Sequence, residues 1–220
     1  MADPAIDDTV PFERHELHGG SWIDIARGWL VHPDALYRAL ETAVPWSQGK
    51  VWRYERYIGE PRLSAGGSLA KPHHPVLVDA QQALQRRYRA QFEGFGLQYY
   101  RDARDSVAMH RDREMRWLDD TVVAILTTGA TRPFLIQRRN TRDASTARDL
   151  APAAGDVMVF GGRFQADWLH GVPKVRHAVR GRISVQWRYT SRRGRPETTP
   201  GYYAPREFSG TGRGRGPGRT

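Results

Sequence analysis

The stretch Ser106-Val-Ala-Met-His-Arg-Asp-Arg-Glu114 places a histidine and an aspartate two residues apart, at His110 and Asp112. In a strand, both side chains would point to the same face, because side chains alternate along a strand. An imidazole and a carboxylate held in this way supply two corners of the 2-His-1-carboxylate triad, which binds non-haem Fe(II) and leaves three positions open. A single His-x-Asp pair is common by chance, so the rest of the chain has to supply the third ligand.

The third ligand is expected from His170. It lies in Asp167-Trp-Leu-His-Gly-Val-Pro-Lys174, after an apolar run, Asp156-Val-Met-Val-Phe160, that is followed by two glycines. His177 is the alternative, but the arginines on either side of it would disfavour a nearby cation. This charge favours His170 over His177 as the third ligand.

A strand with alternating character follows. Its apolar and polar faces consist of Ile183, Val185 and Trp187 on one side and Arg182, Ser184, Gln186 and Arg188 on the other. Two guanidinium groups on one face can each bind a carboxylate in bidentate fashion, which suits a small dicarboxylate. A solvated polar face of a strand would give the same spacing. The arginine pair therefore indicates an anion site only in combination with the His-x-Asp motif and His170, which precede it.

In this order of motifs the chain resembles the AlkB family of Fe(II)- and 2-oxoglutarate-dependent dioxygenases, which are in the main nucleic-acid demethylases. The match runs from Gln98-Tyr-Tyr-Arg-Asp102 through Asp105-Ser-Val-Ala-Met-His110 and Asp120-Thr-Val-Val-Ala-Ile125 to Arg188, with a weaker likeness at Glu60-Pro-Arg-Leu63. The resemblance implies an α+β fold with a double-stranded β-helix, or jelly-roll, core.

The resemblance also implies roles for individual residues. His110, Asp112 and His170 would hold Fe(II), and His170 is preferred over His177 because it follows a strand and precedes Gly171-Val-Pro-Lys174, as in the family pattern. Arg182 would bind the distal carboxylate of 2-oxoglutarate, and Arg188 would lie toward its metal-proximal end. The remaining expected contacts to the cosubstrate are Tyr100, as a hydrogen-bond donor, and Gln98 and Ser184, each in place of a common Asn. O2 would be the second cosubstrate, and the products would be succinate, CO2 and, from an N-methyl group, formaldehyde.

The substrate contacts are marked less clearly. Glu114 is at a position where the family often has an acidic residue near the flipped base, although a solvated charge would look the same. Arg139 could contact a base or a phosphate, or could be an exposed hairpin charge. Arg62, in the Glu60–Leu63 stretch, is a further candidate. Trp52, Tyr54 and Tyr57 could form a recognition lid, although aromatic residues in strand-like segments more often belong to a core.

One departure from the family pattern concerns the substrate. The family commonly has an aromatic pair after the Pro-Arg-Leu stretch, whereas this chain has Gly66-Gly67. The change removes an expected stacking surface and leaves the base specificity open, but it does not touch the predicted metal ligands.

Composition restricts the class of protein. The 220 residues suit one domain, and the absence of cysteine excludes disulfides and thiolate metal sites. The N-terminus is acidic rather than signal-like, and no apolar run approaches membrane-spanning length. We expect a cytoplasmic protein, a monomer, that does not associate with membranes.

The net charge of +10 points to an anionic partner, here methylated DNA or RNA, single-stranded or with a flipped base. Residues 191–220 contribute +5 of this charge through seven arginines and two glutamates. This segment is rich in Gly and Pro and has no apolar period, so we expect it to be disordered. It could bind nucleic acid through phosphate contacts, or serve only solubility.

The coarse pattern suggests four regions: a flexible N-terminus at 1–20, helices and a nucleotide-recognition lid at 21–95, the double-stranded β-helix core at 96–190, and the basic tail at 191–220. Helices are predicted at 32–41 and 78–92, packed on the core, and loops at 64–68 and 71–75. Short alternating strands follow Gly96, as in a β-sandwich.

Three functions are compatible with these observations. The first is oxidative demethylation of alkylated DNA or RNA bases. The second is the same iron chemistry on a protein side chain or a small molecule, which the Gly66-Gly67 departure allows. The third is a non-catalytic nucleic-acid-binding protein that uses the Arg/Gly-rich tail, and the complete triad and arginine pair argue against it.

Overall fold

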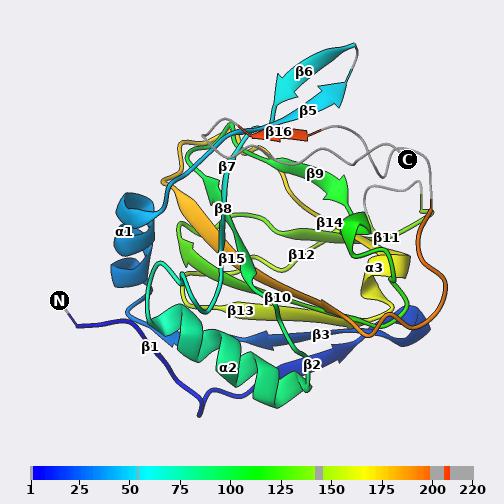
Figure 1. Cartoon of the computed structure of the whole chain (residues 1–220), viewed down its shortest axis with the longest axis horizontal. Helices are drawn as coiled ribbons and strands as arrows, with labels where there is room; N and C mark the ends of the chain where they lie inside the picture. Colours follow the sequence, from blue (N-terminus) through cyan, green and yellow to red (C-terminus); the bar gives the residue numbers. More distant parts are fainter. Residues whose placement is uncertain (1, 54, 142–145, 199–205, 209–220) are drawn as a thin grey trace.

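The computed structural model describes residues 2–53, 55–141, 146–198 and 206–208. Two antiparallel sheets face each other as a jelly-roll sandwich, and two helices cover the outer face of the larger sheet (Figure 1). The expected jelly-roll core is thereby confirmed. The helices are α1 (Pro33–Ala43), α2 (Val76–Tyr88) and the short α3 (Phe164–Asp167), with single 3-10 turns η1 (His18–Gly20) and η2 (Arg113–Met115).

The larger sheet has seven strands, which are in spatial order β2 (Glu13–Glu16), β3 (Ser21–Ala26), β13 (Val157–Gly162), β10 (Thr121–Gly129), β15 (Arg182–Thr190), β8 (Phe95–Tyr100) and β7 (Leu63–Gly67). The smaller sheet has four, which are β12 (Arg148–Asp149), β11 (Leu135–Arg138), β14 (Trp168–Val172) and β9 (Val107–His110). Two further groups are the pair β1 (Ala5–Ile6) and β4 (Leu30–Val31), and the three strands β16 (Arg206–Phe208), β5 (Gly49–Arg53) and β6 (Arg56–Gly59).

The larger sheet is buried on both faces, which explains its apolar central strands. In β10, Val122, Ala124 and Leu126 pack with the helices, whereas Val123 and Ile125 pack against the smaller sheet. The alternation follows from the period of two along a strand. The same alternation in β15 sends Ile183, Val185 and Trp187 toward the helices, as predicted, and leaves the arginine face between the two sheets.

Helix α1 lies close to the predicted limits. Pro33 occupies the first turn, where its missing N–H has no intrahelical partner to lose, and Leu36 and Leu40 are fully buried against the sheet. Helix α2 begins two residues earlier than predicted and ends at Tyr88, before Arg89 adopts a positive φ of 50°. Ala80 and Leu84 form its buried face.

The glycines at 66 and 67 lie in a strand and not in the predicted loop. Strand β7 pairs with β8 at the edge of the larger sheet, with Gly66 opposite Gly96 and Gly67 opposite Phe95. A Cβ atom at Gly67 would collide with the ring of Phe95. The Phe95 ring therefore occupies the space that a side chain at position 67 would need. The glycines that suggested a loop belong to a strand, because the adjacent strand fills the space beside them.

The N-terminal segment also differs from the prediction. Residues 1–20 were expected to be flexible, but Ala5–Ile6 pair with β4, and Glu13–Glu16 pair with β3 as the outer strand of the larger sheet. The polar sequence of β2 suits an edge strand, because backbone hydrogen bonds and the Arg14–Asp24 ion pair attach it. Since β3 and β7 both belong to the larger sheet, the core also extends beyond the predicted limits of 96–190.

The C-terminal region has two described parts. Residues 191–198 continue from β15 along the loop that follows β9, where the Ser191 N–H donates to the Asp120 carbonyl and the Glu197 N–H to that of Arg116. Residues 206–208 form β16 beside β5, next to the β5–β6 hairpin that projects from the body (Figure 1). The predicted tail therefore begins later than residue 191, and residues 199–205 and 209–220 lie outside the described residues.

In the part of the chain that the structure describes, none of the helices is both long and apolar enough to cross a membrane.

Candidate metal centre and anion pocket

Two predicted metal ligands are cross-strand partners in the smaller sheet. His110 ends β9 and lies opposite His170 in the middle of β14. Side chains directly opposite each other on one face of an antiparallel pair are neighbours, and the two imidazole centroids are 4.4 Å apart. The pairing of β9 with β14 is therefore what brings together residues that are sixty positions apart in the chain.

Asp112 adds the carboxylate from the loop just beyond β9. Its Oδ1 lies 3.5 Å from Nε2 of His110 and 3.8 Å from Nε2 of His170. One ligand atom from each of the three residues can be chosen so that all lie within 4.8 Å of one another, and no other such group occurs among the described residues. His177 is exposed and outside this group, as predicted.

The tautomer of the neutral His110 ring is set by a backbone contact. Nδ1 lies 2.9 Å from the Ala108 carbonyl, to which it can only donate, so the lone pair of the neutral ring is on Nε2, the atom that faces Asp112. Burial lowers the pKa of His110, but the hydrogen bond and the charge of Asp112 outweigh burial, and the pKa is raised overall.

His170 is held neutral. Burial, and then the proximity of His110, lower the pKa of the His170 imidazole to about 3, against the opposing effect of Asp112. The rings of Phe134, Phe160 and Phe164 surround it at centroid distances of 5.8, 6.1 and 6.2 Å. A neutral imidazole in an apolar setting is the form that a metal ion requires.

Asp112 is ionised and held by a guanidinium. Burial raises the pKa of the carboxyl, but Arg188 and the two histidines outweigh burial and leave the pKa well below its usual value. Arg188 Nε donates to Oδ2 at 2.8 Å, which leaves Oδ1 turned toward the histidines. Two nitrogen atoms and one carboxylate oxygen form a donor set that fits a divalent transition metal such as Fe(II).

The predicted cosubstrate residues share one face of two neighbouring strands. In the register of β8 with β15, Tyr100 lies opposite Arg182 and Gln98 opposite Ser184. Tyr100 belongs to the core between the sheets, so the residues two positions away from it face the same space. Burial raises the pKa of the Tyr100 hydroxyl. The surrounding arginines lower this pKa by a smaller amount, with Arg62 and then Arg182 having the largest effects.

Arg182 is a buried cation for which the described residues supply no ion pair. It is fully buried, and burial lowers the pKa of its guanidinium to about 10, so it stays charged at neutral pH. Its contacts to the Arg132 carbonyl and the Thr127 hydroxyl are long, at 3.5 and 3.4 Å, and its Nε has no hydrogen-bond partner among the described residues. A buried charge is costly unless paired, so the site fits a ligand that brings a carboxylate.

Gln98 and Ser64 organise Arg62. The Gln98 Oε1 accepts from Arg62 Nε at 2.6 Å and from the Ser64 hydroxyl at 3.1 Å, while Glu60 lies 3.2 Å from the same guanidinium. The charge of Arg62 acts on both Tyr100 and His110, which places it beside the site. Gln98 thus has its oxygen committed to Arg62, and only its NH2 remains for a cosubstrate.

The other predicted substrate residues are divided. Glu114 is half-exposed and lies 3.9 Å from Arg188 Nε, so it borders the site. Arg139 directly follows β11 and is exposed. Its guanidinium donates to the Ala166 carbonyl at 3.4 Å, and the described residues show no contact between Arg139 and the triad. Of the suggested lid aromatics, Tyr57 is exposed on β6; Tyr54 lies outside the described residues.

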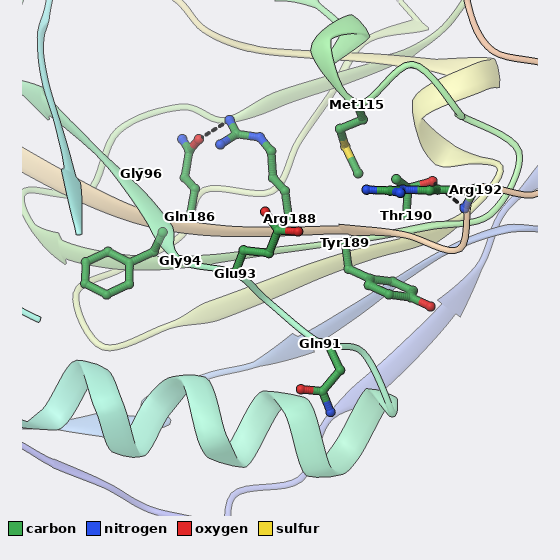
Figure 2. Close-up of a pocket in the computed structure, with 11 residues that line it drawn as sticks. Gln91, Glu93, Gly94, Gly96, Met115, Gln186, Arg188, Tyr189, Thr190 and Arg192 are labelled. Atoms are coloured by element: carbon green, nitrogen blue, oxygen red, sulfur yellow. Dashed lines mark hydrogen bonds between the residues drawn. The ribbon is translucent and has the colours of Figure 1, made fainter. Parts of the chain in front are cut away.

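A groove of about 510 Å³ adjoins the site at Arg188 (Figure 2). Arg188 projects beside Gln186, which accepts a hydrogen bond from it at 2.5 Å, and Met115 and Arg192 flank the opening. The groove is lined by Gln91, Glu93, Gly94, Phe95, Gly96, Met115, Gln186, Arg188, Tyr189, Thr190 and Arg192. The Arg188 guanidinium thus binds the Asp112 carboxylate and also lines the groove.

Two buried residues near the site escaped the sequence analysis. Gln165 of α3 accepts a hydrogen bond from the Asp112 backbone. Arg132 donates to the carbonyls of Asp102, Asp105 and Pro173 and so fixes the loop that leads into β9. Both contacts join segments that are distant in the sequence, and no local pattern marks either residue.

Comparisons with known proteins agree with this geometry. The family described as the 2OG-Fe(II) oxygenase superfamily matches residues 31–195. The alpha-ketoglutarate-dependent dioxygenase alkB homolog 3 of Bos taurus is 30% identical over 72% of this chain and 62% of its own length. The human DNA oxidative demethylase ALKBH2 is 24% identical over 70% and 67%, respectively. The alkB homolog 3 relatives are matched over only about three fifths of their length.

A solved structure shows the same fold. A 2OG-Fe(II) oxygenase family oxidoreductase from Burkholderia pseudomallei superposes with a TM-score of 0.53 at 14% identity, over 76% of this chain and 84% of that one.

Proposed function

Since this chain belongs to the 2OG-Fe(II) oxygenase superfamily and is similar to AlkB homologues, we propose that it is an AlkB-type enzyme that removes methyl groups oxidatively from alkylated nucleic-acid bases. The observation that carries the proposal is the convergence of His110, Asp112 and His170, together with a buried Arg182 that lies over the Phe134 ring, which stacks with His170, and that has no ion-pair partner among the described residues. A metal triad alone would suit many reactions. The added cation between the sheets supports a dicarboxylate cosubstrate.

Each protein group has a distinct task in this proposal. Nε2 of His110, Nε2 of His170 and Oδ1 of Asp112 would hold Fe(II), because the other atoms of His110 and Asp112 are engaged by Ala108 and Arg188. Arg182 would bind the distal carboxylate of 2-oxoglutarate, with Ser184 and the NH2 of Gln98 along the same face. Tyr100 would donate a hydrogen bond from its hydroxyl to the cosubstrate, because burial keeps the phenol protonated.

The bound metal, 2-oxoglutarate and O2 together supply the oxidation that turns an N-methyl group into a hydroxymethyl group, with succinate and CO2 as products. The hydroxymethyl base then releases formaldehyde. The chain's own contribution is orientation and exclusion: the apolar rings of Phe134, Phe160 and Phe164 pack around His170, whereas the side chains of His110 and Glu114 are partly exposed.

We infer the substrate class from the charges near the triad. A methylated base has to leave the base stack to reach the metal, and Glu114, half-exposed beside Arg188, would meet a base that carries positive charge. Arg62 would contact the adjacent phosphate or base edge. The net charge of +10 supports DNA or RNA as the polymer that presents the base, and we expect the protein to act as a monomer.

The test is coupled product release. The protein, reconstituted with Fe(II) under anaerobic conditions, is given O2, 2-oxoglutarate and each of a panel of methylated DNA and RNA oligonucleotides. We expect equal amounts of formaldehyde and succinate with at least one oligonucleotide, and none from an Asp112→Asn variant. Release of succinate without formaldehyde on every oligonucleotide would contradict the nucleic-acid substrate.

A second candidate keeps the chemistry and changes the substrate to a protein side chain or a small molecule. Gly66 and Gly67 favour it, because they occupy positions where the family commonly has an aromatic pair. The Phe95 ring fills the space beside Gly67, so no aromatic side chain could be accommodated at position 67 without a shift. A stacking surface for a base would then have to come from elsewhere. Succinate production that is stimulated by methylated peptides, and not by oligonucleotides, would support this alternative.

A further inference from the structure

Asp112 is the member of the triad that no sheet holds in place. His110 and His170 are fixed by the pairing of β9 with β14, whereas Asp112 lies two residues beyond the end of β9. Its side chain is 2% exposed, and its carboxylate is fixed by Arg188. Its backbone still needs an anchor, because a buried N–H without an acceptor is unfavourable and because rotation of the backbone would move the carboxylate.

The anchor is the side chain of Gln165. Its Oε1 accepts the Asp112 N–H at 2.8 Å, in a contact that is buried on both sides. Gln165 is fully buried in α3, the short helix that immediately precedes β14 and therefore His170. The hydrogen bond thus connects the segment that carries Asp112 to the segment that carries His170.

The orientation of the amide is determined by this one contact. Gln165 Nε2 is buried and has no hydrogen-bond partner among the described residues, so nothing else on the described chain selects the position of the oxygen. The reversed amide would place an N–H against the Asp112 N–H. The side chain therefore acts as an acceptor toward Asp112.

We propose that Gln165 is a positioning residue for the metal centre, which acts by accepting the Asp112 N–H and so holding the carboxylate at the distance from the two histidines that a metal ion needs. The inference rests on the metal site of the proposed function. It predicts that metal affinity depends on an acceptor at position 165 and not on the amide NH2 or on the volume of the side chain alone.

Co(II) is a suitable probe, because its ligand-field absorption reports both binding and the geometry of the ligands. Gln165→Met keeps the size but removes the acceptor, and we expect it to weaken Co(II) binding by about 10–100-fold, the usual effect of losing a partner that orients a ligand. Gln165→Glu, which burial and the neighbouring carboxylate of Asp112 should keep protonated, presents its carbonyl oxygen in the same place, and we expect affinity within a few fold of the original and an unchanged Co(II) spectrum.

Gln81 provides a matched control. It is also fully buried, with Nε2 donating to the Phe92 carbonyl at 2.8 Å and Oε1 accepting from Trp187 Nε1 at 3.1 Å, but it lies on the helix side of the larger sheet. Gln81→Met should lower the melting temperature without changing Co(II) affinity. Circular dichroism verifies that each variant is folded before titration.

The outcomes separate the two proposals. Equal Co(II) affinity in Gln165→Met and the original chain overturns the role of Gln165, as does equal weakening in Gln165→Met and Gln165→Glu. If Gln165→Met does not fold, Gln165→Asn takes its place, since its oxygen is withdrawn by one methylene, and it must bind more weakly than Gln165→Glu. Absence of Co(II) binding by the original chain would overturn the metal site itself, and with it both proposals.

Discussion

Arg188 and Asp112 are joined by a hydrogen bond of 2.8 Å between Nε and Oδ2, and this bond divides the carboxylate into one oxygen held by the protein and one turned to the histidines. Arg188 comes from β15 of the larger sheet, whereas both histidines belong to the smaller sheet. The candidate metal centre therefore depends on both halves of the sandwich.

Arg188→Lys should reduce turnover of 2-oxoglutarate by about 10–100-fold, because the lysine ammonium is a point charge that does not reproduce the directed Nε–H contact with Asp112. Succinate formation measures the effect. Arg192→Lys serves as the control, since Arg192 lines the adjoining groove but does not contact the triad in the described residues. Equal activity of the two variants would show that the Arg188–Asp112 bond does not matter.

His170→Ala should abolish Fe(II) binding and turnover, whereas His177→Ala should leave both unchanged. His170 supplies a buried neutral imidazole to the triad, and His177 is exposed and outside it. Equilibrium dialysis with Fe(II) under anaerobic conditions measures binding, and circular dichroism monitors folding. The opposite pattern would require a different third ligand.

Arg182→Met should stabilise the ligand-free protein while abolishing its response to 2-oxoglutarate. An unpaired buried cation is unfavourable, so its removal should raise the free energy of unfolding by about 1–3 kcal/mol. Arg132→Met is the matched control: it removes three hydrogen bonds to backbone carbonyls and should destabilise by about 1–3 kcal/mol. Urea unfolding with and without 2-oxoglutarate measures both. A destabilised Arg182→Met protein would mean that the guanidinium is already compensated.

Glu197→Gln should lower the free energy of unfolding by about 1–2 kcal/mol. The Glu197 carboxylate lies 2.5 Å from the Arg111 guanidinium, and the two side chains are only 16% and 10% exposed, so the loss leaves a largely buried charge. Arg193→Gln breaks an exposed ion pair to Asp120 in the same segment and should cost less than about 0.5 kcal/mol. Indistinguishable unfolding of the two variants would mean that the Glu197 contact is without consequence.

The parts of the fold that the sequence predicted are those in which each residue's surroundings follow from its immediate neighbours. The alternation in β15 assigned Ile183 and Arg182 to opposite faces, and the i, i+4 spacing of Leu36 and Leu40 located α1. The triad was predictable because its ligands are chemically distinctive residue types, and because the family resemblance specified which histidine to choose.

The parts that were missed depend on partners distant in the sequence. Gly66 and Gly67 form a strand only because β8 and the Phe95 ring lie beside them, and Glu13–Glu16 form one only because β3 is available. Gln165 has no local feature that announces its contact with Asp112. The expectations of a cytoplasmic location and a monomeric state stay predictions.

The opposition of His110 and His170 across β9 and β14 makes the centre sensitive to strand alignment. A slip of one residue in this pairing would turn one imidazole to the opposite surface of the sheet, since neighbouring positions alternate. A chain misaligned by a single step would lack the three-residue metal centre. Metal uptake during refolding would therefore report whether the smaller sheet has reached its native alignment.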